Sequence, residues 1–595
     1  MKNPIYLFLC LFILLSGCNY LDVIPNEFVT DDDIWKDVTK AEKLVTRLYT
    51  VLDNRQGLDI ASDLMAATDE TKNHWGNPSV WKFNTGNWGP SDNPFDNWKA
   101  RYEDIRIANL FINNAFRIVI PENKKDYWTQ RIPRYTAECR MIRAWFYYEL
   151  LCKYGPVPIL TPDSDDGNVN KLRIPRSSVD ELIRFLTDEL DQSAAVLPES
   201  YDSQERGRVT RGAALALKAK VLLQAASPLL NGNPLYKEIR NFDGKYLFNA
   251  QYDADKWLKA AMAAKAVLDM ADRGIYRLSR KYPDNPIASY ASLFYTREYE
   301  ETIFFKLRSS QTEIDKRLVP NGTEFFGNGK YSVSQEHIDA YEMNNGYPIN
   351  EPGSGYDKTG FWDGYLFDGT ESVAVTDISV RFRNRDPRFY ASVFYQGAVW
   401  RFKSTRRQMH FAFWNNRNNQ KEGWPKLGTN CESGYNIRKW CSPEVDLRNN
   451  HGSCERNYPI IRLAEMYLIY AEALNEYLDK PDMRVYQAVN AVRNRVNMPS
   501  LPIIPADYTK EGMRKRIQNE YRVEFAFENH RFFDVRRWLI AKTTDNGAIH
   551  GLNALPAVAE MDESGIMDES DKRRGLYPFY KEVVLQKRVF EDKHY

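Results

Sequence analysis

Apolar residues recur at helical spacing in two blocks of the chain, about residues 39–270 and 462–539. In both blocks they fall three or four positions apart, the spacing that places them on one face of a helix. In the first block the pattern predicts helices over residues 39–52, 102–118, 127–154, 178–196, 211–226 and 254–270. In the second block it predicts helices over residues 462–477, 485–496 and 511–539.

Local signals at the ends of these segments favour the same assignment. Ser178 is a predicted N-cap, and Glu181 three residues later completes a capping box. Gly155-Pro156 ends the helix before it, because neither residue continues one. Helices of similar length joined by short polar turns predict antiparallel pairs stacked into a solenoid, similar to tetratricopeptide hairpins, although no clean consensus repeats along the chain.

Between the blocks, residues 272–457 are rich in Gly, Asn and aromatic residues, with short alternating runs such as Ser392-Val393-Phe394-Tyr395. This composition predicts loops and short strands, and the segment is too long to be a simple linker. Loop-rich insertions on a rigid scaffold commonly display binding residues. The predicted fold class is mainly α: a tetratricopeptide-like helical-pair scaffold with a large loop-rich insertion that contains short strands.

The start of the chain predicts export and a lipid anchor. Residues 5–15 are eleven uninterrupted apolar residues after Met1 and Lys2, too few to cross a bilayer and suited to a secretory signal. Leu15-Ser16-Gly17-Cys18 resembles the lipobox of bacterial lipoproteins, in which the thiol becomes a thioether to diacylglycerol. We expect the mature protein to begin at Cys18, tethered to a membrane without crossing it. The alternative is an ordinary signal peptide with a chance cysteine.

The expected organisation follows from these patterns. It consists of a signal peptide (1–17), a lipid-anchored segment (18–38), a helical scaffold (39–271) with an aromatic loop (73–98), a loop-rich ligand-binding insertion (272–457), and a C-terminal helical scaffold with an irregular tail (458–595).

Composition excludes several classes of protein. The 81 basic and 80 acidic residues nearly cancel, which argues against a nucleic-acid partner because phosphate binding needs a net basic surface. A mean hydropathy of −0.57 excludes a polytopic membrane protein, and 43% hydrophobic residues exclude a disordered chain. A large soluble body remains.

The seven cysteines are too sparse for a disulfide framework. Cys10 leaves with the signal, and Cys139 and Cys152 lie in an apolar helical run where we expect them to be buried. A zinc site has no CxxC or HxxxH pattern to support it. One disulfide is expected among the three cysteines of the polar late stretch, Cys431, Cys441 and Cys454.

Several segments together resemble the SusD/RagB family of lipoproteins. Residues 137–150, followed by Tyr154-Gly155-Pro156-Val157-Pro158, look like the family signature "AEaRflRAfyyf.L…yGdvPl". Similar to the same family are the lipobox followed by Leu21-Asp22-Val23-Ile24-Pro25, and residues 461–473, 490–495, 520–528 and 531–538. Family members commonly continue past the position of His594-Tyr595 with a "LfPIP…Ei…NP" segment, and this chain ends there.

The resemblance implies a location and a function. The protein would lie on the outer face of the outer membrane of a Bacteroidetes-type bacterium. There it would cap a SusC-like TonB-dependent barrel and pass captured oligosaccharide into it, without catalysis and without a cofactor. Peptide uptake by a branch of the same family is the main alternative. A lipid-anchored glycoside hydrolase and a scaffold that docks partners on its helices are the others.

An oligosaccharide offers apolar C–H faces and hydroxyls, so its site needs exposed rings flanked by polar side chains. Residues 73–98 have that composition, and in SusD-like proteins this region helps build the glycan platform. Its Gly and Pro residues are expected to prevent a regular helix, which would place the rings on loops; Trp98, at the start of the next helix, is expected in the core. Loop packing is the equal alternative for the tryptophans. The candidates are Trp75, Trp81, Trp88, Asn73, Asn77 and Asp92.

A second aromatic group lies in the middle insertion and is expected to form the opposite wall of the site. Each ring taken alone is more commonly packing than ligand contact. The candidates are Tyr290, Tyr295, Phe325, Phe326 and Trp362, with Phe294, Tyr331, Phe361 and Tyr365 beside them.

Charged residues in the family signatures are expected to hold the fold and not to form a site. Four of them are spaced for ion pairs along the helix predicted over residues 127–154, namely Glu138, Arg140, Arg143 and Glu149. Four others are expected to form a charge network near the end of the second block, namely Glu520, Arg522, Glu524 and Arg531.

The sequence carries no strong catalytic or metal motif. Asp69-Glu70 is a carboxylate pair, but adjacent residues direct their side chains apart, which does not suit glycosidase chemistry. GxSxG, HExxH and P-loop patterns are missing. Residues 163–168 are oxygen-rich, but Gly167 comes one position early for an EF-hand, so we expect a solvated turn, with calcium binding as the alternative.

Overall fold

The computed structural model describes residues 31–54, 63–73, 76–94, 96–160, 174–320, 327–403, 405–409, 432–447, 452–552 and 582–592. These residues are rich in helix and carry a few short strands, which confirms the predicted mainly α class. Among them, no helix combines the length and the apolar character needed to cross a bilayer. Several predictions fall outside the described residues: those on Cys18, Trp75, Phe325, Phe326, Cys431 and the turn at 163–168.

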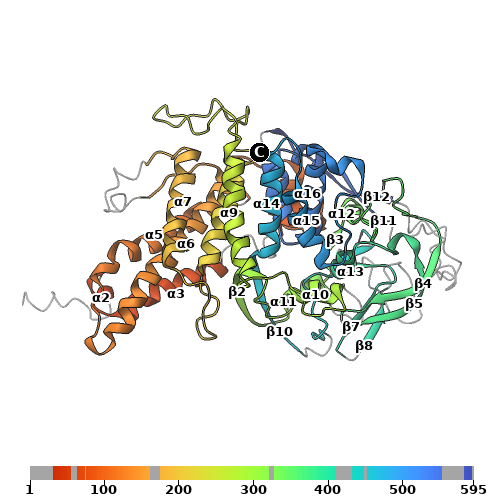
Figure 1. The fold of residues 1–595 in the computed structure, drawn as a ribbon, viewed down its shortest axis with the longest axis horizontal. Helices are drawn as coiled ribbons and strands as arrows, with labels where there is room; N and C mark the ends of the chain where they lie inside the picture. Colours follow the sequence, from red (N-terminus) through yellow and green to blue (C-terminus); the bar gives the residue numbers. More distant parts are fainter. Residues whose placement is uncertain are drawn as a thin grey trace, which may run out of the picture.

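The first predicted block forms a helical array at one end of the molecule (Figure 1). Its helices are α2 (Asp31–Trp35), α3 (Val38–Asn54), α5 (Trp98–Asn114), α6 (Lys125–Tyr154), α7 (Val179–Val196), α8 (Arg211–Ala226) and α9 (Asp255–Asp272), with the short turns η3 (Ala115–Arg117) and η4 (Glu122–Lys124). From α5 to α9, each helix packs against the next, as expected for a stacked array. The predicted capping box is confirmed, since Ser178 Oγ accepts from the Glu181 N–H at 3.3 Å and Glu181 Oε2 from the Ser178 N–H at 2.8 Å.

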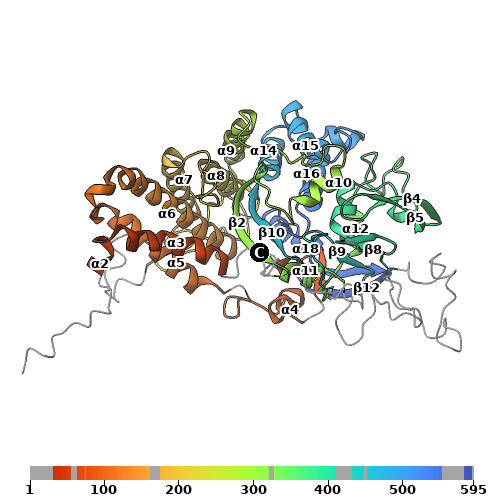
Figure 2. The ribbon, with the colours of Figure 1, turned by 90° about the horizontal axis from the view of Figure 1, so that it is seen from below.

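The second predicted block continues the same array. Its helices are α14 (Leu463–Tyr477), α15 (Met483–Arg495), α16 (Lys510–Glu524), α17 (His530–Arg537) and α18 (Ala541–Thr544), with the short turn η8 (Pro505–Tyr508). α14 packs against α9, although residues 273–462 separate them in sequence, and the two helices lie side by side in Figures 1 and 2. One apolar core therefore runs through both blocks, from Val45 of α3 to Ile517 of α16.

The prediction of a single helix over residues 511–539 was wrong. The chain breaks between α16 and α17, where Phe527 and Asn529 adopt left-handed backbone conformations with φ of 60° and 64°. Contacts with the N-terminal part hold this break. Asn529 Oδ1 accepts from the Met65 N–H at 3.0 Å, and Glu70 Oε1 accepts from the Phe527 N–H at 3.4 Å.

The middle of the chain forms short strands and helices around a second apolar core. β2 (Thr302–Gln311) pairs antiparallel with β10 (Cys454–Arg462) between the helical array and the rest of the insertion (Figure 1). A four-stranded sheet has the order β1 (Thr71–Asn73), β3 (Tyr331–Val333), β9 (Tyr435–Ile437), β6 (Val393–Tyr395), which confirms the strand expected near residue 393. Three hairpins pair β4 (Phe361–Phe367) with β5 (Ser372–Ser379), β7 (Val399–Phe402) with β8 (Thr405–Gln408), and β11 (Gly547–Leu552) with β12 (Glu582–Arg588).

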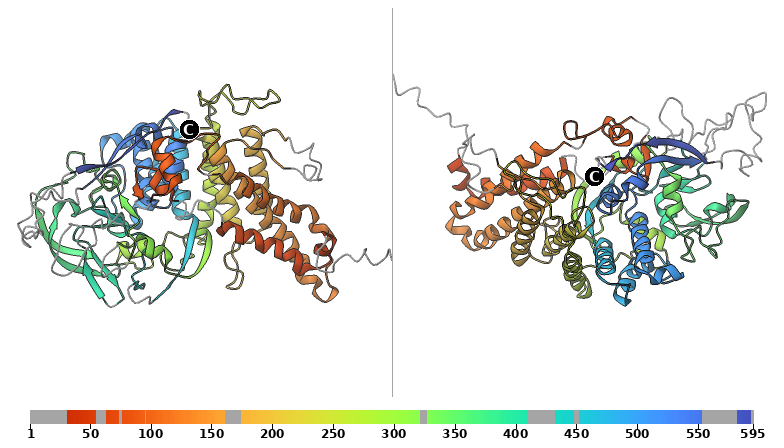
Figure 3. Two further views of the ribbon diagram at one scale, coloured as in Figure 1. Left: turned by 180° about the vertical axis from the view of Figure 1, so that it is seen from behind. Right: turned by 90° about the horizontal axis from the view of Figure 1, so that it is seen from above.

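Short helices connect these strands. They are η2 (Leu64–Ala67), α4 (Pro78–Thr85), α10 (Pro286–Ser292), α11 (Glu313–Leu318), α12 (Gln335–Ala340), η7 (Val380–Phe382) and α13 (Pro387–Ser392). α4 lies on the rear face of the molecule, which the left view of Figure 3 shows. α10 lies on the opposite face, toward the viewer in Figure 1.

The four signature charges of α6 pair mostly with residues outside this helix, although Glu138 also lies 3.5 Å from Arg134 along it. Arg140 and Arg143 both donate to Glu189 of α7, Arg140 at 2.5 Å. Glu138 accepts from Arg208 at 2.8 Å, and Glu149 lies 2.8 Å from the Arg101 guanidinium of α5. These buried pairs fix the spacing of neighbouring helices, because removing one partner would leave a buried charge uncompensated.

The four residues of the charge network predicted near the end of the second block divide between two groups: Arg522 and Arg531 pair with Asp69, and Glu520 and Glu524 belong to a separate network. Glu524 accepts from Arg462 and Arg495 at 2.5 Å and from Arg388 at 3.0 Å, and Arg388 also donates to Glu520 at 2.5 Å. Burial alone would raise the pKa of Glu524, but the three guanidiniums hold that pKa well below 4.5. The network joins α13, β10 and α15 to α16.

Two of the three predicted disulfide partners are free thiols. Cys441 and Cys454 are buried and unbonded to each other, and Cys454 Sγ donates instead to the carbonyl of Tyr295 at 2.7 Å. Cys139 is buried and Cys152 is partly buried, in keeping with their predicted place in the helical core.

Candidate functional site

The carboxylate of Asp63 joins the predicted aromatic loop to the middle insertion. Asn73 Nδ2 donates to it at 3.1 Å and Asn77 Nδ2 at 2.8 Å. From the insertion, Lys330 Nζ donates at 2.7 and 3.0 Å, and the Tyr331 hydroxyl also donates. Asp63 is 2% exposed and has a left-handed backbone with φ of 59°. Asn73 and Asn77, both predicted ligand contacts, therefore have their amide groups engaged in holding this junction.

Strand pairing at this junction joins the N-terminal part of the chain to the middle insertion. β1 and β3 are antiparallel, and Asn73, the last residue of β1, pairs with Tyr331, the first residue of β3. In the sequence, Trp75 follows β1, and Phe325 and Phe326 precede β3. These three rings lie outside the described residues.

Trp81 is displayed on a helix, so the expectation that its segment is a loop was wrong. α4 begins at Pro78, because proline suits the first helical position, where its missing N–H needs no partner. Asn77 caps this end by accepting from the Ser79 N–H at 2.9 Å, and Gly86, with φ of 67°, ends the helix. The Trp81 side chain is 54% exposed.

Trp88 has a packing role. Its ring lies edge-on to Phe83, 5.0 Å between centroids, and Phe83 in turn packs on Phe532 of α17 at 5.3 Å. Together with Leu64, these rings form a small apolar cluster beneath α4. Trp88 thus fits the alternative prediction for the tryptophans, which was packing within the loop. The Trp81 ring, in contrast, is open to solvent.

Asp92 and Lys82 form the polar border of this surface. Lys82 Nζ donates to both carboxylate oxygens of Asp92 at 2.5 and 2.7 Å, and a backbone bridge between Gly89 and Asp92 closes the turn that carries Asp92. Both side chains remain partly exposed. A charged donor on α4 and a charged acceptor on the turn after it therefore lie together, and charged groups form the stronger hydrogen bonds.

A buried charge group lies beneath β1. Asp69 accepts from Arg531 at 2.8 and 2.9 Å and forms an ion pair with Arg522, 2.8 Å away. Burial alone would raise the pKa of Asp69, but these guanidiniums lower it. Burial and the adjacent Asp69 charge raise the pKa of Glu70 to about 8, and burial, with Arg522, lowers the pKa of His337. The Asp69-Glu70 pair is sealed from solvent, so a glycosidic bond cannot lie between these carboxyls.

The second aromatic group is divided among three places. Tyr290 is fully buried, its hydroxyl donating to the Glu524 carbonyl at 2.7 Å and accepting from Lys439 at 2.8 Å, so it belongs to the core and not to a ligand wall. Tyr295 is partly buried on the face that carries α10. Trp362 packs against the second core from the β4–β5 hairpin, which Figures 1 and 2 place at the far end of the insertion from α4.

Sequence reasoning missed Asp63, Lys82 and Lys330 as parts of the site. Asp63 and Lys330 are far apart in sequence and become partners only through the β1–β3 pairing. Lys82 follows Trp81 directly in the sequence. A charged residue next to an aromatic candidate could have indicated Lys82 as part of the site.

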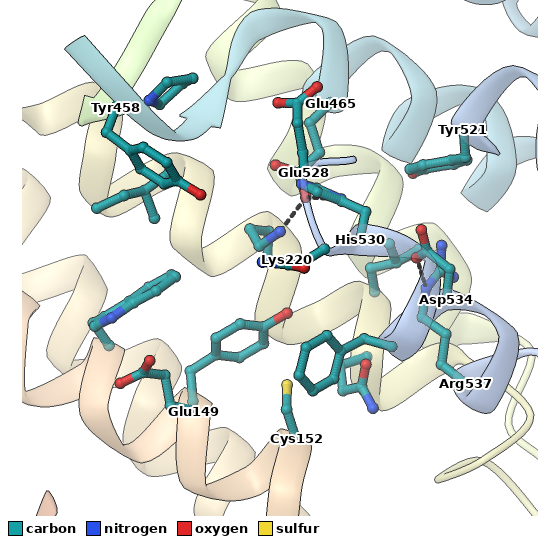
Figure 4. Close-up of a pocket in the computed structure, with 18 of the residues that line it drawn as sticks. Glu149, Cys152, Lys220, Tyr458, Glu465, Tyr521, Glu528, His530, Asp534 and Arg537 are labelled. Carbon is teal, nitrogen blue, oxygen red and sulfur yellow. Dashed lines mark hydrogen bonds and ion pairs between the residues drawn. The ribbon is translucent and has the colours of Figure 1, made fainter. Parts of the chain in front are cut away.

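An interior pocket of about 80 Å³ lies between α6, α8, β10, α14 and α17 (Figure 4). Four of its charges are paired with one another, Lys220 with Glu465 and Arg537 with Asp534 at 2.9 Å, and Glu149 and Glu528 pair with arginines outside it. The volume is small beside the roughly 300 Å³ or more of ordinary small-ligand sites. We therefore place the candidate site on the α4 surface.

Comparisons with known proteins agree with this architecture. The model of the SusD family matches residues 288–585, and the model described as starch-binding associating with outer membrane matches residues 19–223. "SusD-like protein P25" of Formosa agariphila is 22% identical over 90% of this chain and 89% of its own length. A SusD-like protein of Bacteroides fragilis has a TM-score of 0.68 at 25% identity, over 95% of this chain and 94% of its own. A laminarin-binding SusD-like protein has a TM-score of 0.55 at 18% identity, over 91% and 96%. The chain therefore belongs to the SusD family of outer-membrane-associated, carbohydrate-binding proteins.

Proposed function

We propose that this protein is a non-catalytic surface lipoprotein that captures an oligosaccharide on the α4 surface and delivers it to a SusC-like TonB-dependent transporter. Family membership supports carbohydrate binding as the general activity. The fold likeness to a laminarin-binding protein agrees with a glycan ligand.

We choose the α4 surface as the site because it displays the exposed ring of Trp81. Its helix is capped at both ends, and the turn that leads into it is tied through Asn77 to Asp63. A ring held on a rigid element loses little entropy when a sugar stacks on it. Lys82 and Asp92 lie beside it as donor and acceptor. Trp75, Phe325 and Phe326 remain further proposed ligand contacts from the sequence pattern.

Delivery and anchoring complete the proposal. Cys18 would carry the lipid, and the residues up to Asp31, the first of α2, would link it to the helical array. A tether of this length spans at most about 45 Å when extended, which keeps the body close to the membrane. Replacing Cys18 by Ser should move the protein from the membrane fraction to the soluble fraction. Retention of the variant in the membrane fraction would contradict the anchor.

The burial and pairing of Asp69 and Glu70, the carboxylates considered for glycosidase chemistry, support the absence of catalysis. Asp69 is held by two arginines, and Glu70 is buried. Purified protein incubated with a bound oligosaccharide should therefore release no new reducing ends, and release above a buffer blank would overturn this part of the proposal.

Calorimetric titration tests the site directly. The protein should bind at least one of laminarihexaose, cellohexaose, xylohexaose, mannohexaose and maltoheptaose, and Trp81→Ala should lower the affinity of the α4 site at least tenfold. Tyr508→Ala, which removes a similarly exposed ring (62%) from η8, should leave binding unchanged. Binding of peptides and of no saccharide would favour the peptide-uptake alternative. Full binding by Trp81→Ala would remove the α4 surface from the proposal.

A further inference from the structure

A second depression lies beside α10. Figures 1 and 2 show α10 on the face of the molecule opposite α4. It has a volume of about 520 Å³, within the range of about 300–1,000 Å³ that small-ligand sites occupy. α10 and the segment after it form one side, and the turns at residues 369–370 and 442–444 form the other. The first residues of β10 close one end.

An exposed tyrosine ring stands at the rim of this groove on a fixed turn. Tyr282 is 43% exposed, yet its backbone is held at both polar atoms by Ser289 of α10. The Tyr282 N–H donates to Ser289 Oγ, and Ser289 Oγ donates to the Tyr282 carbonyl, both at 2.9 Å. Asn285 then caps α10 by accepting from the Ala288 N–H at 2.9 Å. The ring is therefore presented to solvent by an ordered backbone, as a stacking platform requires.

Part of the groove lining is apolar and packs on the core. Tyr295 is partly buried against the second core, and its carbonyl accepts from Cys454 Sγ at 2.7 Å. Ala288 and Pro443 add apolar lining. Apolar lining beside an exposed ring matches the C–H face of a pyranose.

The charges around the rim balance. Arg297 lies 3.3 Å from Glu455, and both side chains are about half exposed. Lys281 Nζ donates to Thr296 Oγ1 at 3.4 Å and lies 5.9 Å from the Tyr282 ring, while Glu444 lies across the groove. A planar donor beside a carboxylate acceptor, with no excess of either sign, suits hydroxyl groups and does not select a charged ligand.

We propose that this groove is a second saccharide-binding site, which takes a neutral pyranose chain independently of the α4 surface. The inference rests on the proposed function for its ligand class and concerns a separate face of the molecule. Tyr282 stacks on a sugar ring, and Arg297 and Glu455 bind its hydroxyls. Two such sites on opposite faces let one protein hold two chains, or two segments of one long chain.

Titration of the full-length protein in detergent with the hexaose that binds best tests the groove. Trp81→Ala should leave a residual site, and adding Tyr282→Ala should weaken that site at least tenfold. Tyr282→Phe keeps the stacking ring and should bind as the parent does, which separates lost stacking from lost folding. Hydroxyl-radical footprinting at saturating hexaose should protect Tyr282 in the Trp81→Ala variant.

The outcomes separate the two proposals. If Trp81→Ala removes all binding, or if Tyr282→Ala leaves the residual site unchanged, the groove proposal is overturned and the α4 site stands. If Tyr282→Ala alone removes all binding, the groove stands and the α4 site falls. If none of the saccharides binds, both proposals fail.

Discussion

Asn73 of β1 lies directly opposite Tyr331 of β3, and both side chains donate to the carboxylate of Asp63. Residues 74–330 separate these two positions in the sequence, yet their side chains share one buried acceptor. The junction sets the position of α4 relative to β3, and with it the position of the exposed Trp81 ring.

Replacing Asp63 by Asn should loosen this junction. Asn tolerates the left-handed backbone at this position, so the change removes the charge and leaves the shape. Lys330, whose side chain is only 14% exposed, would lose its partner, and we expect a loss of about 3 kcal/mol in the free energy of unfolding. Urea unfolding measures this. Asp92→Asn, which breaks the more exposed pair with Lys82, is the matched control and should cost less than about 1 kcal/mol. Equal effects would contradict the central role of Asp63.

Trp81 and Trp88 should respond in opposite ways to alanine substitution. Trp88→Ala removes a ring that packs edge-on against Phe83, and we expect a stability loss of about 2 kcal/mol. Trp81→Ala should change stability by less than about 0.5 kcal/mol and lower saccharide affinity instead. Thermal unfolding and calorimetric titration of both variants provide the comparison, and a large stability loss in Trp81→Ala would show that its ring is packed.

Glu70 should make stability depend on pH. Its pKa is about 8 in the folded protein against 4.5 for an ordinary glutamate, because burial and the Asp69 charge disfavour its ionised form. Between about pH 4.5 and pH 8 the folded state therefore keeps a proton that the unfolded state releases, and the Glu70 contribution to unfolding free energy falls as pH rises. Glu70→Gln removes this term, so the variant should gain stability relative to the parent from pH 5 to pH 8.

The comparison between parent and variant matters because His337 acts in the other direction. Its pKa is depressed by burial, so its contribution is lost as pH falls below 6.5. Both proteins carry His337, which lies 4.0 Å from Glu70, and above pH 6.5, where this histidine is neutral folded and unfolded, the difference between them isolates Glu70. Glu122→Gln, at a side chain 85% exposed, should show no pH-dependent difference. A flat difference between Glu70→Gln and the parent would mean that Glu70 titrates normally.

Glu189 should be more important than its surface-like sequence context indicates. It accepts from Arg140 and Arg143 of α6, and its side chain is 5% exposed. Glu189→Gln should lower the free energy of unfolding by about 3 kcal/mol because two guanidiniums lose their shared anion. Glu181→Gln on the same helix, whose carboxylate is more exposed, should cost about 1 kcal/mol through the capping box. Denaturant unfolding distinguishes the two values.

Helices were predictable where their signals are local. α8 has the predicted bounds, and the Ser178 capping box needed only three residues of context. α4 also has standard helix-end signals in Asn77, Pro78 and Gly86, but the many Gly and Pro residues around it favoured a loop. The break before α17 was not predictable, because Phe527 and Asn529 are held by Glu70 and Met65.

The candidate site was predictable in composition and not in geometry. The tryptophan-rich segment identified Trp81, but the same pattern included Trp88, which differs only in having Phe83 and Phe532 as neighbours. Tyr290 could not be distinguished from a surface ring, since its burial depends on Glu524 and Lys439 from distant segments. Exposure is a property of the folded surroundings, and a single residue type does not encode it.

The contact between α9 and α14 has a consequence for how the chain must mature. The apolar face of α9 is covered only after residue 463 has been made, since α14 is its partner on that side. Because the chain is made from its N-terminus, the first helical block keeps one uncovered face until the whole insertion has been made. Such an unfinished array exposes apolar surface and invites self-association. We expect a fragment that stops before α14 to aggregate, and a separately supplied C-terminal fragment to rescue its solubility.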